Sequence, residues 1–181
     1  MGMAVPVYYT ADMVRALPDD GHRYEVVHGE LLVTPAPTLP HQTLVKRFLV
    51  ALELYLRRNP VGLVLSSPAD ISWASDLLVQ PDVFVVPRAD PPPRDWTDIR
   101  SLLLAVEVLS PSTARYDRFT KRRLYQEFGV PSYWLADRSQ QQVEIWTPEA
   151  TFPVVERSRL IWTPQPAREP FVLELRELFE D

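Results

Sequence analysis

The chain has 181 residues, of which 46% are hydrophobic and 24% charged, a composition typical of a globular protein. Its formal net charge of −5 argues against a general nucleic-acid coat but leaves room for a local basic patch. It has no cysteine, which excludes disulfides, thiolate metal sites and a cysteine nucleophile. Any metal ion would be held by oxygen ligands or by one of three histidines, which favours a hard cation such as Mg²⁺ or Mn²⁺.

No apolar run approaches the ~20 residues of a membrane-spanning helix. The N-terminal stretch lacks the basic start and apolar run of a secretory signal. We therefore expect a cytoplasmic protein with no membrane contact. A chain of this length fits one domain, which we expect to span residues 1–181.

The first half of the chain predicts short strands, one short helix and one long helix. The short helix begins after a capping Thr10, and a hairpin turns at His28-Gly29. Apolar residues at helical spacing predict the long helix, and three consecutive prolines predict a loop. The expected ranges are helices at 10–18 and 39–59, strands within 23–35, 62–71 and 80–87, and a loop at 88–96.

The second half begins with "LLLAVEVL", residues 102–109, whose apolar character predicts a central strand covered on both faces. A loop and a helix that stops at Gly129 follow it. Further strands are expected at 131–137, 141–147 and 150–156, and a strand leading into a short helix at 171–180. Strands and helices alternate in the middle of the chain and hairpins flank them. The fold class is therefore α/β or mixed α+β, with a central mixed sheet between helices.

Two acids stand out in these strands. Glu107 lies inside the apolar central strand, where an unpaired carboxylate would cost several kcal/mol. Asp82 follows Pro81 at the start of the preceding strand. If the two strands are neighbours, both carboxylates can converge on one divalent cation. The alternative is that Glu107 pairs with an arginine or caps a neighbouring backbone group.

Lys121 is one of only two lysines, in a chain that otherwise uses arginine. On an ideal helix it shares a face, within roughly 60°, with apolar residues that must pack on the sheet. The residues on that face are Asp117, Leu124, Tyr125 and Phe128. Such a lysine could orient a nucleophilic water or neutralise charge on a transition state. The alternative is an ordinary ion pair between Asp117 and Lys121 on the helix surface.

These features resemble the PD-(D/E)XK nuclease superfamily and, more narrowly, the bacterial Uma-two group of restriction endonuclease-like proteins. The resemblance covers roughly residues 20–175. It is carried by the stretches "YEVVHGELLVTPAP", "QPDVFVV", "VEVLSPSTARYDRFTKRRLYQEFGVPSYWLAD" and "VEIW". It implies a restriction-endonuclease-like fold and Mg²⁺-dependent hydrolysis of phosphodiester bonds.

Carried over to this sequence, the resemblance makes Asp82 and Glu107 the metal ligands. The sequence departs from the superfamily pattern at Leu109, where the motif expects lysine, so Lys121 from the following helix becomes the candidate. Such sites often include a further acid from the N-terminal region. Glu30 is the candidate for this role, with Glu25 behind it, although either could be an exposed hairpin carboxylate.

Several other residues remain candidates with weaker assignments. His41, at the start of the long helix, could donate to a phosphate or simply cap the helix. Either of two acids near a strand end could replace Asp82 if the strand register differs. These acids are Asp70 and Asp76. The arginines expected to contact nucleic-acid phosphates are Arg115, Arg118, Arg122 and Arg123.

Three functions are compatible with these residues. The first is a Mg²⁺-dependent DNA endonuclease in which Mn²⁺ can replace Mg²⁺, acting as a homodimer so that two sites cut two strands. The second is a catalytically silent nucleic-acid-binding or self-associating protein on the same fold, which Leu109 and the acidic net charge favour. The third, a non-nuclease metal hydrolase, lacks the paired-histidine spacing of a zinc site.

Overall fold

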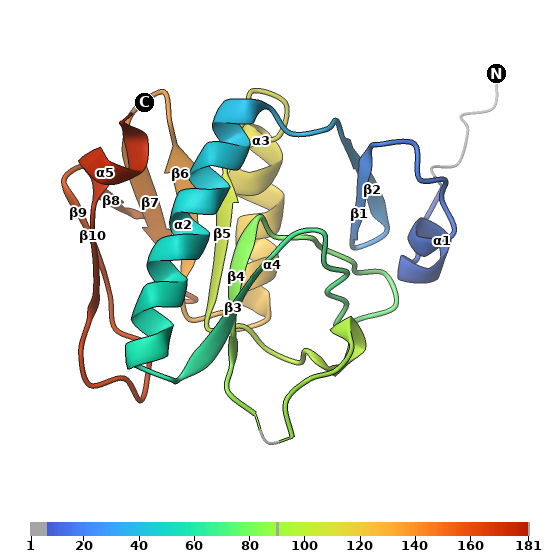
Figure 1. The fold of residues 1–181 in the computed structure, drawn as a ribbon. Coiled ribbons are helices and arrows are strands. Elements are labelled where there is room, and N and C mark those ends of the chain that lie inside the picture. Colours follow the sequence, from blue (N-terminus) through green and yellow to red (C-terminus); the bar gives the residue numbers. More distant parts are fainter. Residues whose placement is uncertain (1–6, 90, 181) are drawn as a thin grey trace.

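The computed structural model describes residues 7–89 and 91–180. Its centre is a six-stranded sheet in the order β3–β4–β5–β6–β7–β8 (Figure 1). Neighbouring strands are antiparallel except for the parallel pair β5 and β6. The strands are β3 Gly62–Ser66, β4 Val83–Pro87, β5 Leu104–Val108, β6 Tyr133–Asp137, β7 Gln142–Trp146 and β8 Val154–Glu156. The predicted class, a mixed sheet flanked by helices, is confirmed.

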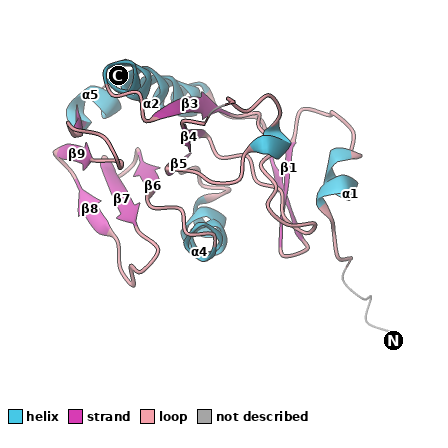
Figure 2. Ribbon diagram, turned by 90° about the horizontal axis from the view of Figure 1, so that it is seen from below, coloured by secondary structure: helices cyan, strands magenta, loops and turns pink. Residues whose placement is uncertain are grey.

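Helices cover both faces of this sheet (Figure 2). On one face lies α2, Leu39–Arg58, whose apolar stripe includes Phe48 and Leu52. On the other lies α4, Arg122–Glu127, which buries Leu124 and Tyr125. Every residue of β5 is buried, as expected for the central strand, so any polar side chain there must find a partner within the fold.

Two hairpins lie outside the central sheet (Figure 1). The predicted one joins β1, Arg23–Val27, to β2, Glu30–Thr34, through His28 and Gly29, whose φ angles of 49° and 79° are those of a tight hairpin turn. The helix α1, Ala11–Arg15, packs on β1, and its Thr10 cap is confirmed by a 3.2 Å bond from the Met13 amide.

The other hairpin joins β9, Arg159–Trp162, to β10, Phe171–Glu174, which leads into α5, Leu175–Phe179. The strand at 159–162 was not predicted from the sequence because its four residues are too few to establish an alternating pattern. The predicted strand at 171–174 and the helix after it are confirmed.

The predicted helix within 110–129 is built from three pieces. A short α-helical turn, α3 Ala114–Tyr116, leads into a π-helical segment, η2 Asp117–Lys121, and α4 follows directly. Gly129, at a φ of 65°, ends the run as expected. The sequence indicated a helix here but not its wider turn, which falls on the segment that carries Lys121.

Other elements differ from the expected ranges mainly at their ends. The strand expected at 62–71 stops at residue 66, and the one expected at 80–87 begins at residue 83. A 3₁₀ turn, η1 Trp96–Asp98, lies at the end of the predicted proline loop, one residue of which is outside the described residues. No helix within 7–89 or 91–180 is long and apolar enough to cross a membrane.

Candidate active site

The register between β4 and β5 brings Asp82 and Glu107 to adjacent positions. Val83 pairs with Val106 in antiparallel register, and the next positions outward are Asp82 and Glu107. Because side chains alternate along a strand, both acids lie on the sheet face that α4 covers. The amide of Val108 donates a 2.9 Å hydrogen bond to Asp82 Oδ2, which ties Asp82 to the strand that carries Glu107.

The amine of Lys121 lies among three carboxylates. Its Nζ is 2.9 Å from Glu107 Oε1, 2.9 Å from Glu25 Oε1 and 3.7 Å from Asp117 Oδ1. The Lys121 side chain is only 1% exposed, and Glu107 is equally buried. The pair of Asp117 and Lys121 therefore exists, but inside the protein rather than on the helix surface. Lys121 is the partner that makes a carboxylate in the central strand tolerable.

The N-terminal acid in this cluster is Glu25, not Glu30. Glu25 lies on β1 with a fully buried side chain, and its Oε1 accepts a 2.7 Å bond from the amide of Gln80 as well as facing Lys121. Glu30 starts β2 at the exposed end of the hairpin, and its carboxylate forms no hydrogen bond or ion pair with the residues that the structure describes. A catalytic role for Glu30 stays a prediction from the resemblance alone.

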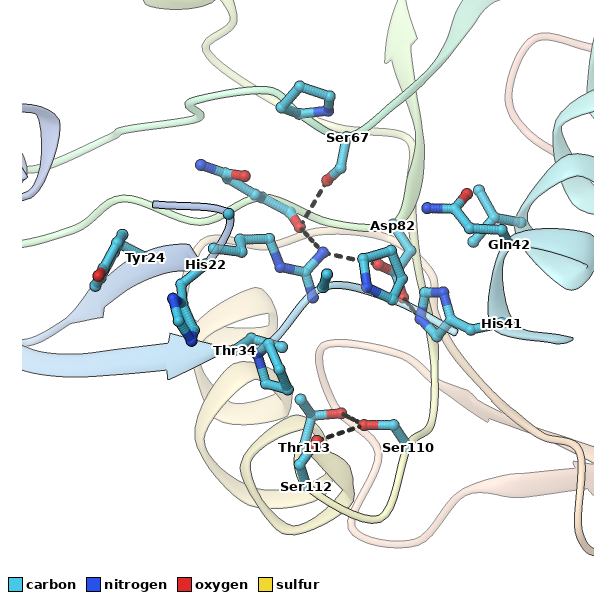
Figure 3. A pocket seen from close by; sticks show the side chains of 18 of the residues that line it. His22, Tyr24, Thr34, His41, Gln42, Ser67, Asp82, Ser110, Ser112 and Thr113 are labelled. Carbon is cyan, nitrogen blue, oxygen red and sulfur yellow. Dashed lines mark hydrogen bonds and ion pairs between the residues drawn. The ribbon is translucent and has the colours of Figure 1, made fainter. Parts of the chain in front are cut away.

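Asp82 is held by two further side chains from distant segments. Arg23 Nη1 donates a 2.8 Å bond to Asp82 Oδ1. His41 Nε2 lies 3.1 Å from Asp82 Oδ2 (Figure 3). Thr38, rather than His41, caps α2, which leaves the imidazole free to reach the acid. Sequence analysis did not single out Arg23. Its only sequence signal is the Arg-x-Glu spacing, which places it on the same face of β1 as Glu25.

The pKa values of the buried acids shift in different directions, depending on whether burial or neighbouring charges dominate. Burial alone would raise the pKa of Asp82, but hydrogen bonds and charge from His41 and Arg23 outweigh it and hold the pKa well below its usual range. Burial raises the pKa of Glu107 well above its usual value despite the nearby Lys121 amine. Burial likewise raises the pKa of Asp117 to about 6.

Lys121 stays protonated. Burial would lower the pKa of its amine, but the charges of Glu107, Glu25 and Asp117 outweigh burial and raise it well above its usual value. The amine is therefore a hydrogen-bond donor and a fixed positive charge rather than a base at neutral pH.

The cluster carries more acids than cations. Its members are the carboxylates of Glu25, Asp82, Glu107 and Asp117 and the cations of Arg23 and Lys121. With every acid ionised, two negative charges are unbalanced. Protons can supply the balance, as the raised pKa values of Glu107 and Asp117 indicate, and so can one divalent cation.

The donor chemistry of this cluster fits a hard cation. Asp82 and Glu107 offer carboxylate oxygens, and Glu25 Oε2 is buried without a hydrogen-bond partner. No three acidic or imidazole groups in the described part of the chain already stand in a metal-binding arrangement. A cation at Asp82 and Glu107 would therefore have to replace contacts that Arg23, His41 and Lys121 now make.

Asp82 is one of the residues that line a cavity of about 820 Å³ (Figure 3). Basic and hydroxyl side chains line much of it, while Glu107 and Lys121 are not among its lining residues. The lining includes Arg15, His22, Arg23, Thr34, His41, Ser110, Ser112 and Thr113. Asp82 is therefore the acid of the cluster that a molecule in the cavity can reach.

None of the four arginines predicted to bind phosphate lines this cavity. Arg118 pairs with Asp137 and Glu144, each at 2.9 Å. Arg122 donates to Gln126 Oε1 at 2.7 Å and lies over the ring of Trp146. The other two, Arg115 and Arg123, are exposed.

The acids considered as substitutes for Asp82 lie outside the cluster. Asp70 accepts a 2.9 Å bond from Gln80 Nε2 and borders the cavity. Asp76 accepts a bond from the Tyr8 hydroxyl. Among the described residues, Asp82 rather than either of these acids pairs with Arg23 and His41, so Asp82 remains the candidate next to β4.

The mixed sheet with helices on both faces, together with acids from adjacent strands and a buried lysine, defines a protein of the restriction-endonuclease-like class. The chain belongs to the Uma2 family, whose model, described as "Putative restriction endonuclease", matches residues 11–173. Its fold is similar to a crystal structure described as "a putative nuclease belonging to DUF820" from Anabaena variabilis. That match has a TM-score of 0.76 and 20% identity over 94% of this chain and 97% of the other. The comparison with curated proteins found no match.

Proposed function

We propose that this protein is a metal-dependent endonuclease that hydrolyses phosphodiester bonds of DNA, with Mg²⁺ as its cofactor and Mn²⁺ as a substitute. The observation that carries the proposal is that Glu107 pairs with the buried Lys121, while Asp82, at the adjacent register position, lines the cavity. Membership of a family described as "Putative restriction endonuclease" supports the same reaction class.

In this proposal Asp82 and Glu107 hold the cation. A divalent cation there would polarise the phosphate and lower the pKa of a bound water. Lys121, which stays charged, would stabilise the negative charge that develops on the phosphate or orient the attacking water as a donor. Glu25 would keep the Lys121 amine in position through its 2.9 Å contact.

The substrate would reach Asp82 through the cavity. Arg115 and Arg123 are exposed and available to phosphates farther along the strand, whereas Arg118 and Arg122 would first have to leave contacts within the protein. Binding through such contacts weakens as salt increases. We propose that a homodimer, acting in the cytoplasm, would supply two sites for the two strands of a duplex.

The test is cleavage of supercoiled plasmid in Mg²⁺ or Mn²⁺ by wild type and Glu107→Gln. We expect wild type to nick the plasmid and Glu107→Gln to be slower by about 100-fold or more, since it removes a charged ligand. The matched control is Glu144→Gln, another buried strand glutamate, which pairs with Arg118 outside the cluster and should leave cleavage unchanged. If wild type and Glu107→Gln show the same background nicking, the catalytic proposal is wrong.

One observation favours the catalytically silent alternative. The carboxylate of Asp82 already accepts bonds from Arg23, His41 and the Val108 amide, as a structural acid would. On that alternative the protein would bind DNA equally well with Mn²⁺ or with a chelator, and no preparation would cut it.

A further inference from the structure

Arg23 is the cation that currently neutralises Asp82. Its Nη1 is 2.8 Å from Asp82 Oδ1 and 3.3 Å from the carbonyl oxygen of Gln80. The other oxygen of Asp82 is taken by His41 and the Val108 amide. Arg23 lines the cavity, and its side chain is 19% exposed, whereas that of Asp82 is 4% exposed. It therefore lies on the path between the cavity and the acid.

A guanidinium cannot leave this contact by losing its proton. Arginine stays charged at any pH that a folded protein tolerates, and the nearby acids raise the pKa of Arg23 further despite its burial. A divalent cation on Asp82 would stand next to that charge in a poorly solvated site, where like charges repel strongly. Arg23 and a divalent cation should therefore compete for Asp82.

The neighbourhood of Arg23 offers its side chain other partners. The Nε atom is buried without a hydrogen bond and lies 3.9 Å from Glu25 Oε2, which also has no hydrogen-bond partner. The cavity of about 820 Å³ that Arg23 borders is large enough for a nucleotide-sized group. A guanidinium turned into that cavity would present paired donors, the geometry that binds phosphate best.

We propose that Arg23 is a displaceable cation, which covers Asp82 until a divalent cation takes its place and then binds a substrate phosphate in the cavity. This inference rests on the nuclease function proposed above. It assigns to Arg23 two linked effects of opposite sign: opposition to metal binding and support of phosphate binding.

The test measures Mn²⁺ binding by calorimetry without any substrate. Arg23→Gln should bind Mn²⁺ at least about tenfold more tightly than wild type, because the competing charge is gone. The matched control is Arg15→Gln, which makes the same charge change in the same cavity lining, while Arg15 contacts Asp12 and Asp70 rather than Asp82. Its Mn²⁺ affinity should stay within about twofold of wild type, since a charge that is paired with other acids and not with Asp82 is screened.

The second readout is binding of a dinucleotide that the protein cannot cut, in saturating Mn²⁺. Arg23→Gln should weaken it by about tenfold or more, as expected for loss of a charge-assisted phosphate contact. If Arg23 had a purely structural role, Arg23→Gln would weaken the binding of both Mn²⁺ and the dinucleotide. Arg23→Lys keeps the charge without the planar guanidinium, so its Mn²⁺ affinity should fall between those of wild type and Arg23→Gln. The two variants together keep the inference testable even if one of them folds poorly.

The outcomes separate this inference from the proposed function. If wild type binds Mn²⁺ and cuts DNA but Arg23→Gln binds Mn²⁺ no more tightly, Arg23 is not a competing cation and only the inference fails. If wild type binds no Mn²⁺ and cuts nothing, the nuclease proposal fails and takes the inference with it.

Discussion

Lys121 holds the cluster together at the level of single residues. Its amine is the only cation within 4 Å of Glu107 among the described residues, and it also faces Glu25 and Asp117. Removing one member of a buried ion pair costs far more than the pair itself contributes, because the partner is left charged and without solvent.

Lys121→Met should therefore destabilise the protein by about 3–5 kcal/mol, as judged by urea unfolding. The double variant Lys121→Met with Glu107→Gln should lose less than the sum of the two single changes, because the second substitution removes the uncompensated acid. Additive losses would show that the two side chains do not interact as the 2.9 Å contact implies.

Asp117 makes the stability of the fold depend on pH. Burial raises its pKa from 3.8 to about 6, so the folded chain binds a proton more tightly than the unfolded chain. Between pH ~4 and ~6 this group lowers stability as pH rises. Asp117→Asn should remove that loss. Between pH 4 and pH 7, the free energy of unfolding of the variant relative to wild type should therefore rise by up to about 3 kcal/mol.

Asp137 provides a control, because its contribution to the free energy of unfolding should depend on pH with the opposite sign. Burial opposes ionisation of Asp137, but hydrogen bonds from Ser139 and Arg118 outweigh it and lower its pKa. Its stabilising contribution is thus present above pH ~4 and is lost on acidification. The penalty of Asp137→Asn should disappear toward low pH. If both variants follow the same pH dependence, the assignment to Asp117 is wrong.

The sequence was informative where a residue type was unusual for its position. An acid inside an apolar strand and a lone lysine on an apolar helix stripe pointed to Glu107 and Lys121. Arg23 and Glu25 carried no such signal, because a hairpin with charged residues is ordinary. Their partners lie more than fifty positions away, and only the packing of the hairpin against the sheet brings them together.

At the scale of elements, the β1–β2 hairpin positions two charged members of the cluster, Arg23 and Glu25. Gly29 sits in its turn at a φ of 79°, and a Cβ there would overlap the ring of Tyr8. The position therefore needs glycine both for its backbone conformation and for its close approach to Tyr8.

Gly29→Ala should destabilise the fold by at least about 2 kcal/mol, from backbone strain and overlap together. The control is Gly21→Ala, at a similar φ of 83° but with open space around its Cβ, which should lose only the strain of about 1 kcal/mol. Thermal unfolding distinguishes the two, and equal losses would mean that the contact with Tyr8 contributes nothing.

The helical segment at 114–127 shows which features the spacing of apolar residues can predict and which it cannot. Spacing of apolar residues predicted a helix with Lys121 facing the sheet, and both are confirmed. It did not reveal the π-helical segment, because a widened turn changes hydrogen-bond pairing without changing which residues are apolar. Phe128, placed on the buried stripe by ideal geometry, is 38% exposed at the helix end.

At the scale of the molecule, the excess of acids in the cluster should couple metal binding to stability. A ligand that binds only the folded chain stabilises it by about 2.7 kcal/mol at a hundredfold excess over its dissociation constant. For a chain of this size that corresponds to an increase in Tm of roughly 5–10 °C.

We expect Mn²⁺ to produce such an increase in wild type and little or none in Asp82→Asn, measured by scanning calorimetry. Asp137→Asn, which alters an acid outside the cluster, should retain the full increase. An equal increase in wild type and Asp82→Asn would place the bound metal elsewhere.

The hairpin's position outside the central sheet also bears on the order of folding. The sheet and its two helices lie within residues 39–156, whereas the contact between Glu25 and Lys121 joins positions nearly one hundred residues apart. Long loops close late because their entropy is lost before their contacts form. We therefore expect the charged cluster to be completed in the final step of folding, so that a chain with a fully formed sheet still lacks Arg23 and Glu25 at the cluster until the hairpin docks.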